Sequence, residues 1–270
     1  MLRCFFIILS VLLLSCKASH KLSLPKRKST AINGADFYKQ ISAMNREERE
    51  PLMIKEITSG NIPEFLRKLI PVKVTITDTA SGKIITATYF VTADYLSIGN
   101  NKKFARVPMT PMAAQQIADS LHCFLPTKKM VDDIYINAKI KLTPEPLTNY
   151  RDSAITFYRH HLLIEQERKN RRGLIAGIKK DVVISSKISS DAKPNRVAIY
   201  GWHQLNGNPI QPLYTGHVNW YVDYSHGIRL VYRTIIINGK NYDYIEVLKD
   251  KQLRKILSDE AVTDFYRYDY

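Results

Sequence analysis

A polar and aromatic segment enclosed by two apolar runs, residues 197–231, dominates the second half of the chain. It contains both tryptophans and three of the seven histidines, among many Tyr, Asn, Gln and Asp residues. The runs 197–200 and 228–237 are rich in Val, Ile and Leu, which predicts two buried strands. The chain must bury these strands against another layer, and the polar groups between them lie at strand ends, where ligand and catalytic sites often form.

Helical and strand patterns are unevenly distributed along the rest of the chain. Apolar spacing and capping residues predict helices at 36–70 (in two segments), 110–122, 126–135, 153–172 with Gly173 as its cap, and 249–257. Alternating or continuous apolar runs predict strands at 72–77, 83–91, 95–98, 104–107, 182–184 and 242–248, the last after an Asn238-Gly239 turn. We therefore expect an α+β fold, with helices mainly in the first half and an antiparallel or mixed sheet mainly in the second.

The amino terminus has the features of an export signal. Arg3 precedes an apolar run over residues 5–14, and that run is too short for a permanent membrane span, which needs about 20 apolar residues. A basic start, a short apolar core and a small residue before the cleavage point are typical of a secretory signal.

The end of this signal, Leu13-Leu14-Ser15-Cys16, resembles the lipobox of bacterial lipoproteins. That resemblance implies that Cys16 becomes the lipidated first residue, bearing palmitate or a similar acyl chain, and anchors the protein to a membrane of the cell envelope. The alternative is an ordinary secreted protein with an incidental Cys16. The expected organisation is a signal peptide at 1–15, a lipidated flexible tether at 16–35 and a single α+β domain at 36–270, with a candidate sub-boundary near 143–150 at the sequence Thr-Pro-Glu-Pro.

The predicted signal peptide and lipidation site determine which cysteines and charges remain in the mature protein. Cys4 leaves with the signal and Cys16 carries lipid, so Cys123 has no partner for an intramolecular disulfide. The net charge of +15 becomes +14 (15 less 1) once Arg3 is removed. A basic segment without acids, 17–30, can lie on anionic headgroups. No nucleic-acid motif is present, so an anionic envelope polymer or glycan is the expected partner, or the basic surface is merely solvated.

An extended conformation over 216–225 would separate two kinds of side chain. One face would carry His217, Asn219, Tyr221, Asp223 and Ser225, and the other Trp220, Val222 and Tyr224. A bend at Gly227 could turn His226 towards Asp223, giving an imidazole oriented by a carboxylate, as a general base requires.

The leading interpretation is an envelope hydrolase that acts on polysaccharide or peptidoglycan by acid–base chemistry. Its predicted catalytic residues are His217, Asp223, His226 and, in a positioning or polarising role, His203; its predicted substrate-binding residues are Trp202, Trp220, Tyr221 and Asn219. A first alternative is a non-catalytic envelope protein that binds glycan or a protein partner through the same aromatic residues. A second is a zinc-dependent hydrolase with His203, His217 and His226 as ligands; otherwise no cofactor is expected. The oligomeric state is left open.

Three other groups are candidate nucleophiles or ligands. The order of Cys123, a histidine and an aspartate along the chain resembles that of papain-like and cell-wall cysteine peptidases. The resemblance is limited to residue order and compartment, since Leu125-Pro126 separates Cys123 from the helix start. The alternative is that Cys123 is a core residue. Ser225 lacks the glycines of a hydrolase nucleophile elbow. Lys179-Lys180-Asp181 could hold an anionic group, or could simply be solvated residues before a strand.

Overall fold

Two β-sheets form the centre of the fold in the computed structural model, which describes residues 20–78 and 81–270. The larger sheet has the strand order β14-β13-β2-β12-β5, with β1 paired to β2. Its strands are β1 (Ile70–Thr77), β2 (Ile84–Val91), β5 (Cys123–Phe124), β12 (Val231–Tyr232), β13 (Thr234–Ile237) and β14 (Lys240–Asp243). The strands pair antiparallel throughout.

The second sheet has the order β10-β9-β8-β11 and contains most of the segment that dominates the second half of the sequence. Its strands are β8 (Lys180–Val183), β9 (Arg196–His203), β10 (Pro209–Val218) and β11 (His226–Gly227). The strands β8, β9 and β10 are antiparallel, whereas β11 runs parallel to β8 and pairs His226 with Lys180. Two small pairs complete the β structure: β3 (Ser97–Gly99) with β4 (Phe104–Arg106), and β6 (Ile140–Lys141) with β7 (Ile175–Ala176).

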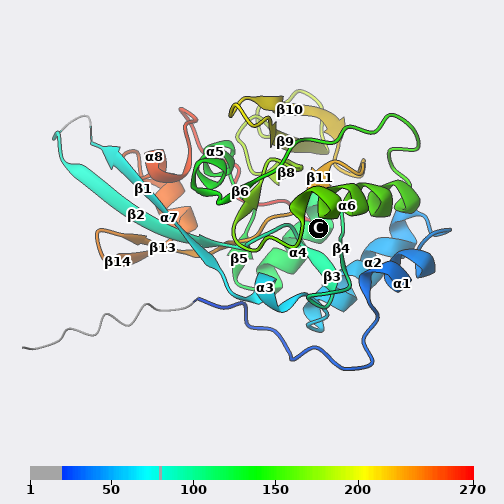
Figure 1. Cartoon of the computed structure of the whole chain (residues 1–270). Coiled ribbons are helices and arrows are strands. Elements are labelled where there is room, and N and C mark those ends of the chain that lie inside the picture. The colour runs from blue at the N-terminus through cyan, green and yellow to red at the C-terminus, as the bar shows by residue number, and fades with distance from the viewer. Residues whose placement is uncertain (1–19, 79–80) are drawn as a thin grey trace, which may run out of the picture.

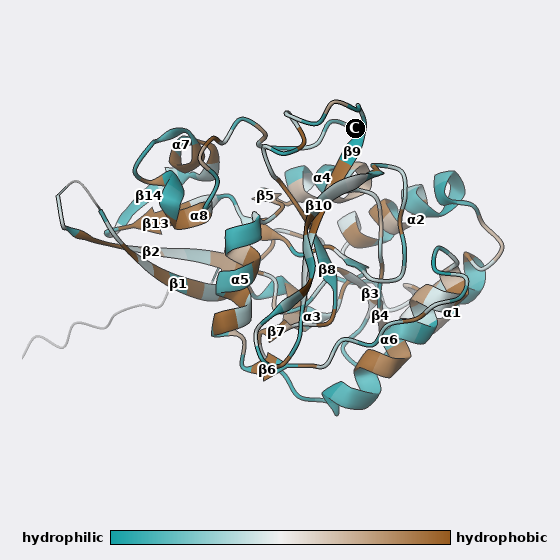
Figure 2. Cartoon of the chain, turned by 90° about the horizontal axis from the view of Figure 1, so that it is seen from above, coloured by the Kyte–Doolittle hydropathy of each residue, from teal (hydrophilic) through white to brown (hydrophobic). Residues whose placement is uncertain are grey.

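The helices lie around these sheets, and several begin at the residues that the sequence predicts. They are α1 (Gly34–Gln40), α2 (Arg46–Thr58), α3 (Glu64–Arg67), α4 (Pro111–Ser120), α5 (Lys128–Asn137), α6 (Ala154–Arg168), α7 (Tyr244–Lys249) and α8 (Arg254–Leu257). The hydroxyls of Thr110, Thr127 and Ser153 each accept a backbone N–H in the first turn of α4, α5 and α6, which satisfies a donor that the helix leaves free. The β1–β2 hairpin extends from one end of the molecule, and α1, α2 and α6 lie at the other (Figures 1 and 2).

Three local predictions are wrong. The segment 242–248, predicted as a strand, turns into α7 at Tyr244, because Asp243 and Glu246 form a reciprocal capping box that starts a helix. The long helix α6 ends at Arg168 rather than 172, since Lys169 and Asn170 adopt positive φ angles of 49° and 59°, so Gly173 is not its cap. The extended conformation expected over 216–225 stops at Val218, where β10 ends.

One large apolar core joins the segments on both sides of the predicted sub-boundary at 143–150. It extends from Leu22 to Tyr268 and includes residues of α1, α4, α6 and both sheets. The described part of the predicted tether, residues 20–35, belongs to this folded body: Leu22 is buried, and its N–H donates to the carbonyl of Arg67 at 2.8 Å. The predicted signal peptide and Cys16 lie outside the described residues.

The fold is α+β, as the sequence predicts, with helices mostly in the first half and sheet strands mostly later. The exceptions are β1 and β2, which come early in the chain and join β12 and β13 in the larger sheet. None of the helices in residues 20–78 and 81–270 is both long and apolar enough to cross a membrane.

Candidate functional site

A buried carboxylate, Asp223, organises the loop between β10 and β11. Beyond Val218 the chain turns back, with the N–H of Tyr221 donating to the carbonyl of Val218 at 3.0 Å and that of Asn219 to Asn195 at 2.8 Å. This turn replaces the expected alternation of faces. Trp220 consequently points to the surface, with 48% of its area exposed, while Val222 is buried in the core.

Asp223 accepts hydrogen bonds on both oxygens. Its Oδ1 accepts from the backbone N–H of Ser225 at 2.8 Å and from the Ser225 hydroxyl at 2.5 Å, and its Oδ2 accepts from Nη2 of Arg151 at 2.6 Å. Burial by itself opposes ionisation, but these donors and the nearby His226 outweigh it, so the pKa of Asp223 lies well below its ordinary value. The carboxylate is therefore charged, and it holds the loop in place.

Three predicted site residues lie beside Asp223, as the hypothesis of a bend at Gly227 requires. The Nε2 atom of His226 is 4.0 Å from Oδ1 of Asp223, and the Tyr221 hydroxyl is 3.4 Å from Oδ2. The ring centroids of His217 and His226 are 6.4 Å apart, and that of Tyr221 is 4.6 Å from His217. The structure thus brings His217, Tyr221, Asp223 and His226 into one cluster.

The members of this cluster differ in their access to solvent. His226 and Asp223 each expose only 1% of their area, whereas His217 is half-buried. Burial lowers the pKa of His226 to about 4, with Asp223 opposing the shift, and burial also lowers the pKa of His217. Both imidazoles are therefore neutral at pH 7. His217 and Tyr221 are the members that a ligand could reach.

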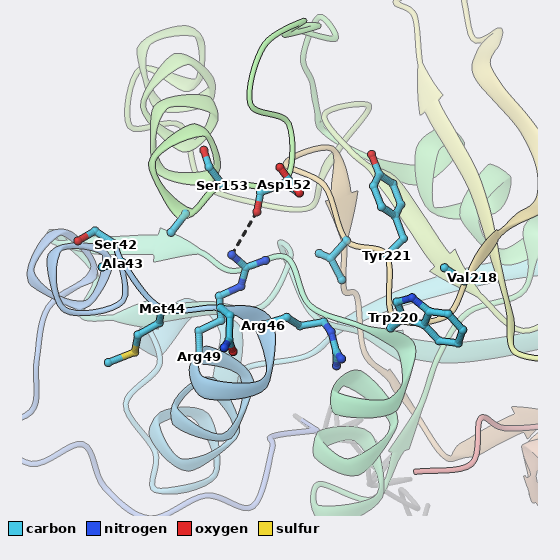
Figure 3. A pocket seen from close by; sticks show the side chains of 13 residues that line it. Ser42, Ala43, Met44, Arg46, Arg49, Asp152, Ser153, Val218, Trp220 and Tyr221 are labelled. Atoms are coloured by element: carbon cyan, nitrogen blue, oxygen red, sulfur yellow. Dashed lines mark hydrogen bonds between the residues drawn. The ribbon is translucent and has the colours of Figure 1, made fainter.

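A groove of about 590 Å³ lies next to the cluster, between the start of α2, the start of α6 and the loop after β10 (Figure 3). Trp220 and Tyr221 form one wall, and Arg46 and Arg49 project from α2 (Figure 3). The remaining lining residues are Ser42, Ala43, Met44, Asn45, Asp152, Ser153, Ala154, Val218 and Val222. We call this cavity the α2–α6 groove.

The α2–α6 groove brings together two arginines, of which Arg49 is buried, and the carboxyl group of Asp152. Arg46 and Arg49 are one helical turn apart, and the amino-terminal ends of two helices of 13 and 15 residues, α2 and α6, meet there. Arg49 donates to the carbonyl of Asp152 at 3.1 Å and lies over the Phe157 ring at 4.8 Å, so it is held rigidly. Arg46 keeps 27% of its side chain exposed and contacts Glu47 and Glu50. Planar cations beside exposed aromatic rings suit an anionic ligand with a flat, partly apolar face.

Sequence reasoning missed a buried network of charged residues behind the groove. Arg106 makes two hydrogen bonds to Asp94, at 3.0 and 2.5 Å, and a third to Glu165 at 2.9 Å. Lys179 donates to the carbonyl of Tyr224 and lies 3.0 Å from Nδ1 of His160. No local pattern in the sequence marks these residues, because their partners are separated by 12 to 59 positions.

The expectation of a solvated Lys179-Lys180-Asp181 segment is wrong. All three side chains are buried. Burial, with Arg106 nearby, lowers the pKa of Lys179 to about 7, and burial raises the pKa of Asp181 to about 6. Lys180 lies over the Trp202 ring at 5.3 Å. Lys179 donates to the carbonyl of Tyr224 and Asp181 accepts from the Tyr95 hydroxyl, so both groups are held inside the molecule and are not presented to an external ligand.

His203 and Trp202 lie apart from the Asp223 cluster. His203 hydrogen-bonds Asp132 of α5, with 2.9 Å between Nε2 and Oδ1, and Trp202 is buried in the core against Tyr224. In residues 20–78 and 81–270, no three His, Cys, Asp or Glu side chains lie close enough together to hold a metal ion. The proposed zinc ligands His203, His217 and His226 therefore do not form one site in this structure.

Cys123 is a core residue in β5. It is 1% exposed, its thiol contacts the carbonyl of Leu121 at 3.3 Å, and burial raises its pKa far above the ordinary value. Ser225 is fully buried, with its hydroxyl donated to Asp223. Neither side chain is placed to attack a substrate.

Comparisons with protein families, curated proteins and solved structures find nothing that matches this chain. The site must therefore be interpreted from its own geometry.

Proposed function

We propose that this chain is a lipid-anchored protein of the bacterial cell envelope that binds an acidic glycan in the α2–α6 groove. The observation that carries the proposal is the juxtaposition of exposed Trp220 and half-buried Tyr221 with Arg46 and the buried Arg49 across one groove. Aromatic faces suit sugar rings, and guanidinium groups pair with carboxylates in a bidentate manner. An acidic polymer also complements the net charge of +15.

The geometry of the cluster around Asp223 fits ligand binding better than it fits catalysis. Of the predicted acid–base set His217, Asp223 and His226, the last two are buried, and Asp223 already accepts three hydrogen bonds from Ser225 and Arg151. A general base must come within hydrogen-bonding reach of the proton that it removes. The role that follows from these contacts is to hold the loop that carries Trp220 and Tyr221 at the edge of the groove.

Titration with polygalacturonate tests the proposal, with neutral dextran as the matched polymer. Trp220→Ala and Arg46→Met should each weaken binding of polygalacturonate about tenfold, corresponding to about 1.4 kcal/mol, and dextran should bind less tightly than polygalacturonate. Tyr270→Ala and Arg172→Ala, exposed residues outside the groove, are the control variants. Equal affinity of all four variants, or equal binding of the two polymers, would count against the proposal.

Hydrolysis remains a second candidate because one observation favours it. His217 is half-buried, its imidazole is neutral at pH 7, and its ring lies 4.6 Å from Tyr221 at the wall of the groove. A hydrolase would release reducing ends from the glycan, and His217→Ala would abolish that release without lowering the melting temperature. A pure binding protein would release none in either form.

The anchor is a separate part of the proposal. It depends on the sequence Leu13-Leu14-Ser15-Cys16. Cys16→Ser should abolish incorporation of labelled palmitate and shift the protein from the detergent phase to the aqueous phase. Incorporation of label into the Cys16→Ser variant would contradict the assignment.

A further inference from the structure

A second imidazole–carboxylate pair lies at a different pocket, between α5 and the β9–β10 hairpin. Nε2 of His203 is 2.9 Å from Oδ1 of Asp132, and the Tyr200 hydroxyl donates to the same oxygen at 2.7 Å. The His203 ring stacks on Tyr135 with 4.5 Å between centroids and 18° between planes. The imidazole is thus fixed in position and in orientation.

A reversal of the backbone places His203 in this pair. In β9, Ala198 and Tyr200 face α5, and regular alternation would put Trp202 on that side as well. Gly201 and Trp202 instead have φ angles of 106° and 57°, so Trp202 joins the main core and His203 faces α5. A tryptophan at positive φ costs of order 1–3 kcal/mol, and backbone strain of this kind is concentrated at functional sites.

The pair determines which imidazole nitrogen is available. Burial opposes ionisation of Asp132, but hydrogen bonds from His203 and Tyr200 and the charge of Lys128 prevail, so the pKa of Asp132 lies below its ordinary value. An ionised Asp132 accepts the Nε2 proton, and the tautomer that fits this contact carries its lone pair on Nδ1. No residue in the described part of the chain hydrogen-bonds that Nδ1 atom.

The pocket of about 450 Å³ beside His203 also contains a cation and an amide. Lys141 lies over the Tyr135 ring, with its Nζ 4.6 Å from the centroid, and Asn206 comes from the tip of the β9–β10 hairpin. Lys128 pairs with Asp132 at 3.3 Å and with Asp259 at 2.8 Å, whereas Lys141 has no carboxylate partner among the described residues, so Lys141 is the cation that the pocket offers.

We propose that this pocket is a second ligand site, which binds a single acidic sugar unit. A sugar hydroxyl donates to Nδ1 of His203, and the carboxylate or phosphate of the same unit pairs with Lys141. Sugar acids and sugar phosphates both present a hydroxyl group next to an anionic group, and this arrangement is what the pocket would recognise. The site does not depend on the α2–α6 groove, since none of its lining residues belongs to that groove.

Nuclear magnetic resonance titration of the imidazole signals tests the proposal on the purified protein without residues 1–19. The probes are glucuronate, glucose 1-phosphate and, as the neutral match, glucose. Both anions should shift the Nδ1 resonance of His203 in a saturable way, with dissociation constants near the millimolar range, and glucose should bind at least fivefold more weakly. Whichever anion binds tighter identifies a carboxylate or a phosphate as the natural group.

Lys141→Met should weaken the binding of both anions about fivefold to tenfold and leave the affinity for glucose unchanged, because the substitution removes only the charge. His203→Phe should abolish binding; should it fail to fold, the half-buried Lys141 provides the independent variant. Arg46→Met, in the groove, should bind all three probes as the wild type does, which separates this proposal from the preceding one. Equal binding of glucose and the anions, no effect of Lys141→Met, or no saturable shift up to about 50 mM would each overturn it.

Discussion

The Asp223–His226 and Asp132–His203 pairs use the same two residue types in different ways. Asp223 and His226 are both buried, and the nearest approach of the imidazole to the carboxylate is 4.0 Å. Asp132 and His203 are 2.9 Å apart, and both line a pocket. A histidine near a carboxylate is therefore not sufficient evidence of a site. Both imidazoles are buried, so the pairs differ in the exposure of the carboxylate and in the number of other donors that it accepts.

The two pairs differ because the two carboxylates have different hydrogen-bond partners and different exposure. Asp223 accepts two hydrogen bonds from Ser225 and one from Arg151, which join its loop to the segment before α6. Asp132 lies on the outer side of α5 with 33% of its side chain exposed. The first pair is part of the folding framework, whereas the second lies at a pocket, with Asp132 partly exposed and His203 buried at 3% exposure.

The largest expected effect is the loss of stability when either aspartate is replaced by alanine. Asp223→Ala leaves Ser225 and Arg151 without their acceptor in the interior, so we expect it to lower the free energy of unfolding by about 3 kcal/mol. Asp132→Ala removes a partly exposed group and should cost about 1 kcal/mol. Urea unfolding at pH 7 measures both. Equal costs would remove the distinction between the two pairs.

The next largest effect is a pH dependence of the folding stability, which His226 causes. An imidazole in the unfolded chain is protonated below about pH 6.5, whereas burial lowers the pKa of His226 in the folded protein to about 4. Between these values the unfolded state binds more protons, so stability falls as the pH decreases through this window.

His226→Gln should make that slope shallower by up to about 1.4 kcal/mol per pH unit, the contribution of one proton. Unfolding measured at several pH values from 7 down to 4.5 gives the slope, and pH 8, where the imidazole is neutral in both states, is the reference. An unchanged slope would mean that His226 titrates at the same pH in the folded and the unfolded protein.

A smaller effect concerns the backbone reversal that positions His203. Gly201→Ala would place a Cβ atom 3.2 Å from Cγ1 of Val131 at a φ of 106°, whereas Gly239→Ala, at a φ of 82°, would meet no atom within 4 Å. We expect costs of about 2 and about 1 kcal/mol respectively. Only Gly201→Ala should also shift the His203 ring signals. A larger cost at Gly239 would show that the close packing on Val131 is easily relieved.

Much of the fold could be predicted because its signals are local. Thr110 caps α4 as expected, α5 begins within two residues of its predicted start, and Asn238-Gly239 forms the turn between β13 and β14 with positive φ at both residues. The strand predicted over 242–248 failed for an equally local reason, since the capping box of Asp243 and Glu246 was overlooked.

The proximity of four of the predicted residues could be foreseen from the sequence. His217, Tyr221, Asp223 and His226 do meet, because they are close in sequence and a turn suffices to bring them together. Arg46 and Arg49 were not singled out, although their spacing of three residues on a helix was visible.

By itself the sequence determined the α+β class, most helix starts, the β1–β2 hairpin and the collection of polar residues around Asp223, all of which depend on neighbours within about ten positions. Only the tertiary structure decided that Arg151 would hold Asp223 across 72 positions, and that His203 would join Asp132 across 71. The physical reason is that burial and pairing of charges depend on which elements pack together, and two positive φ angles are enough to move a side chain from one face of a strand to the other.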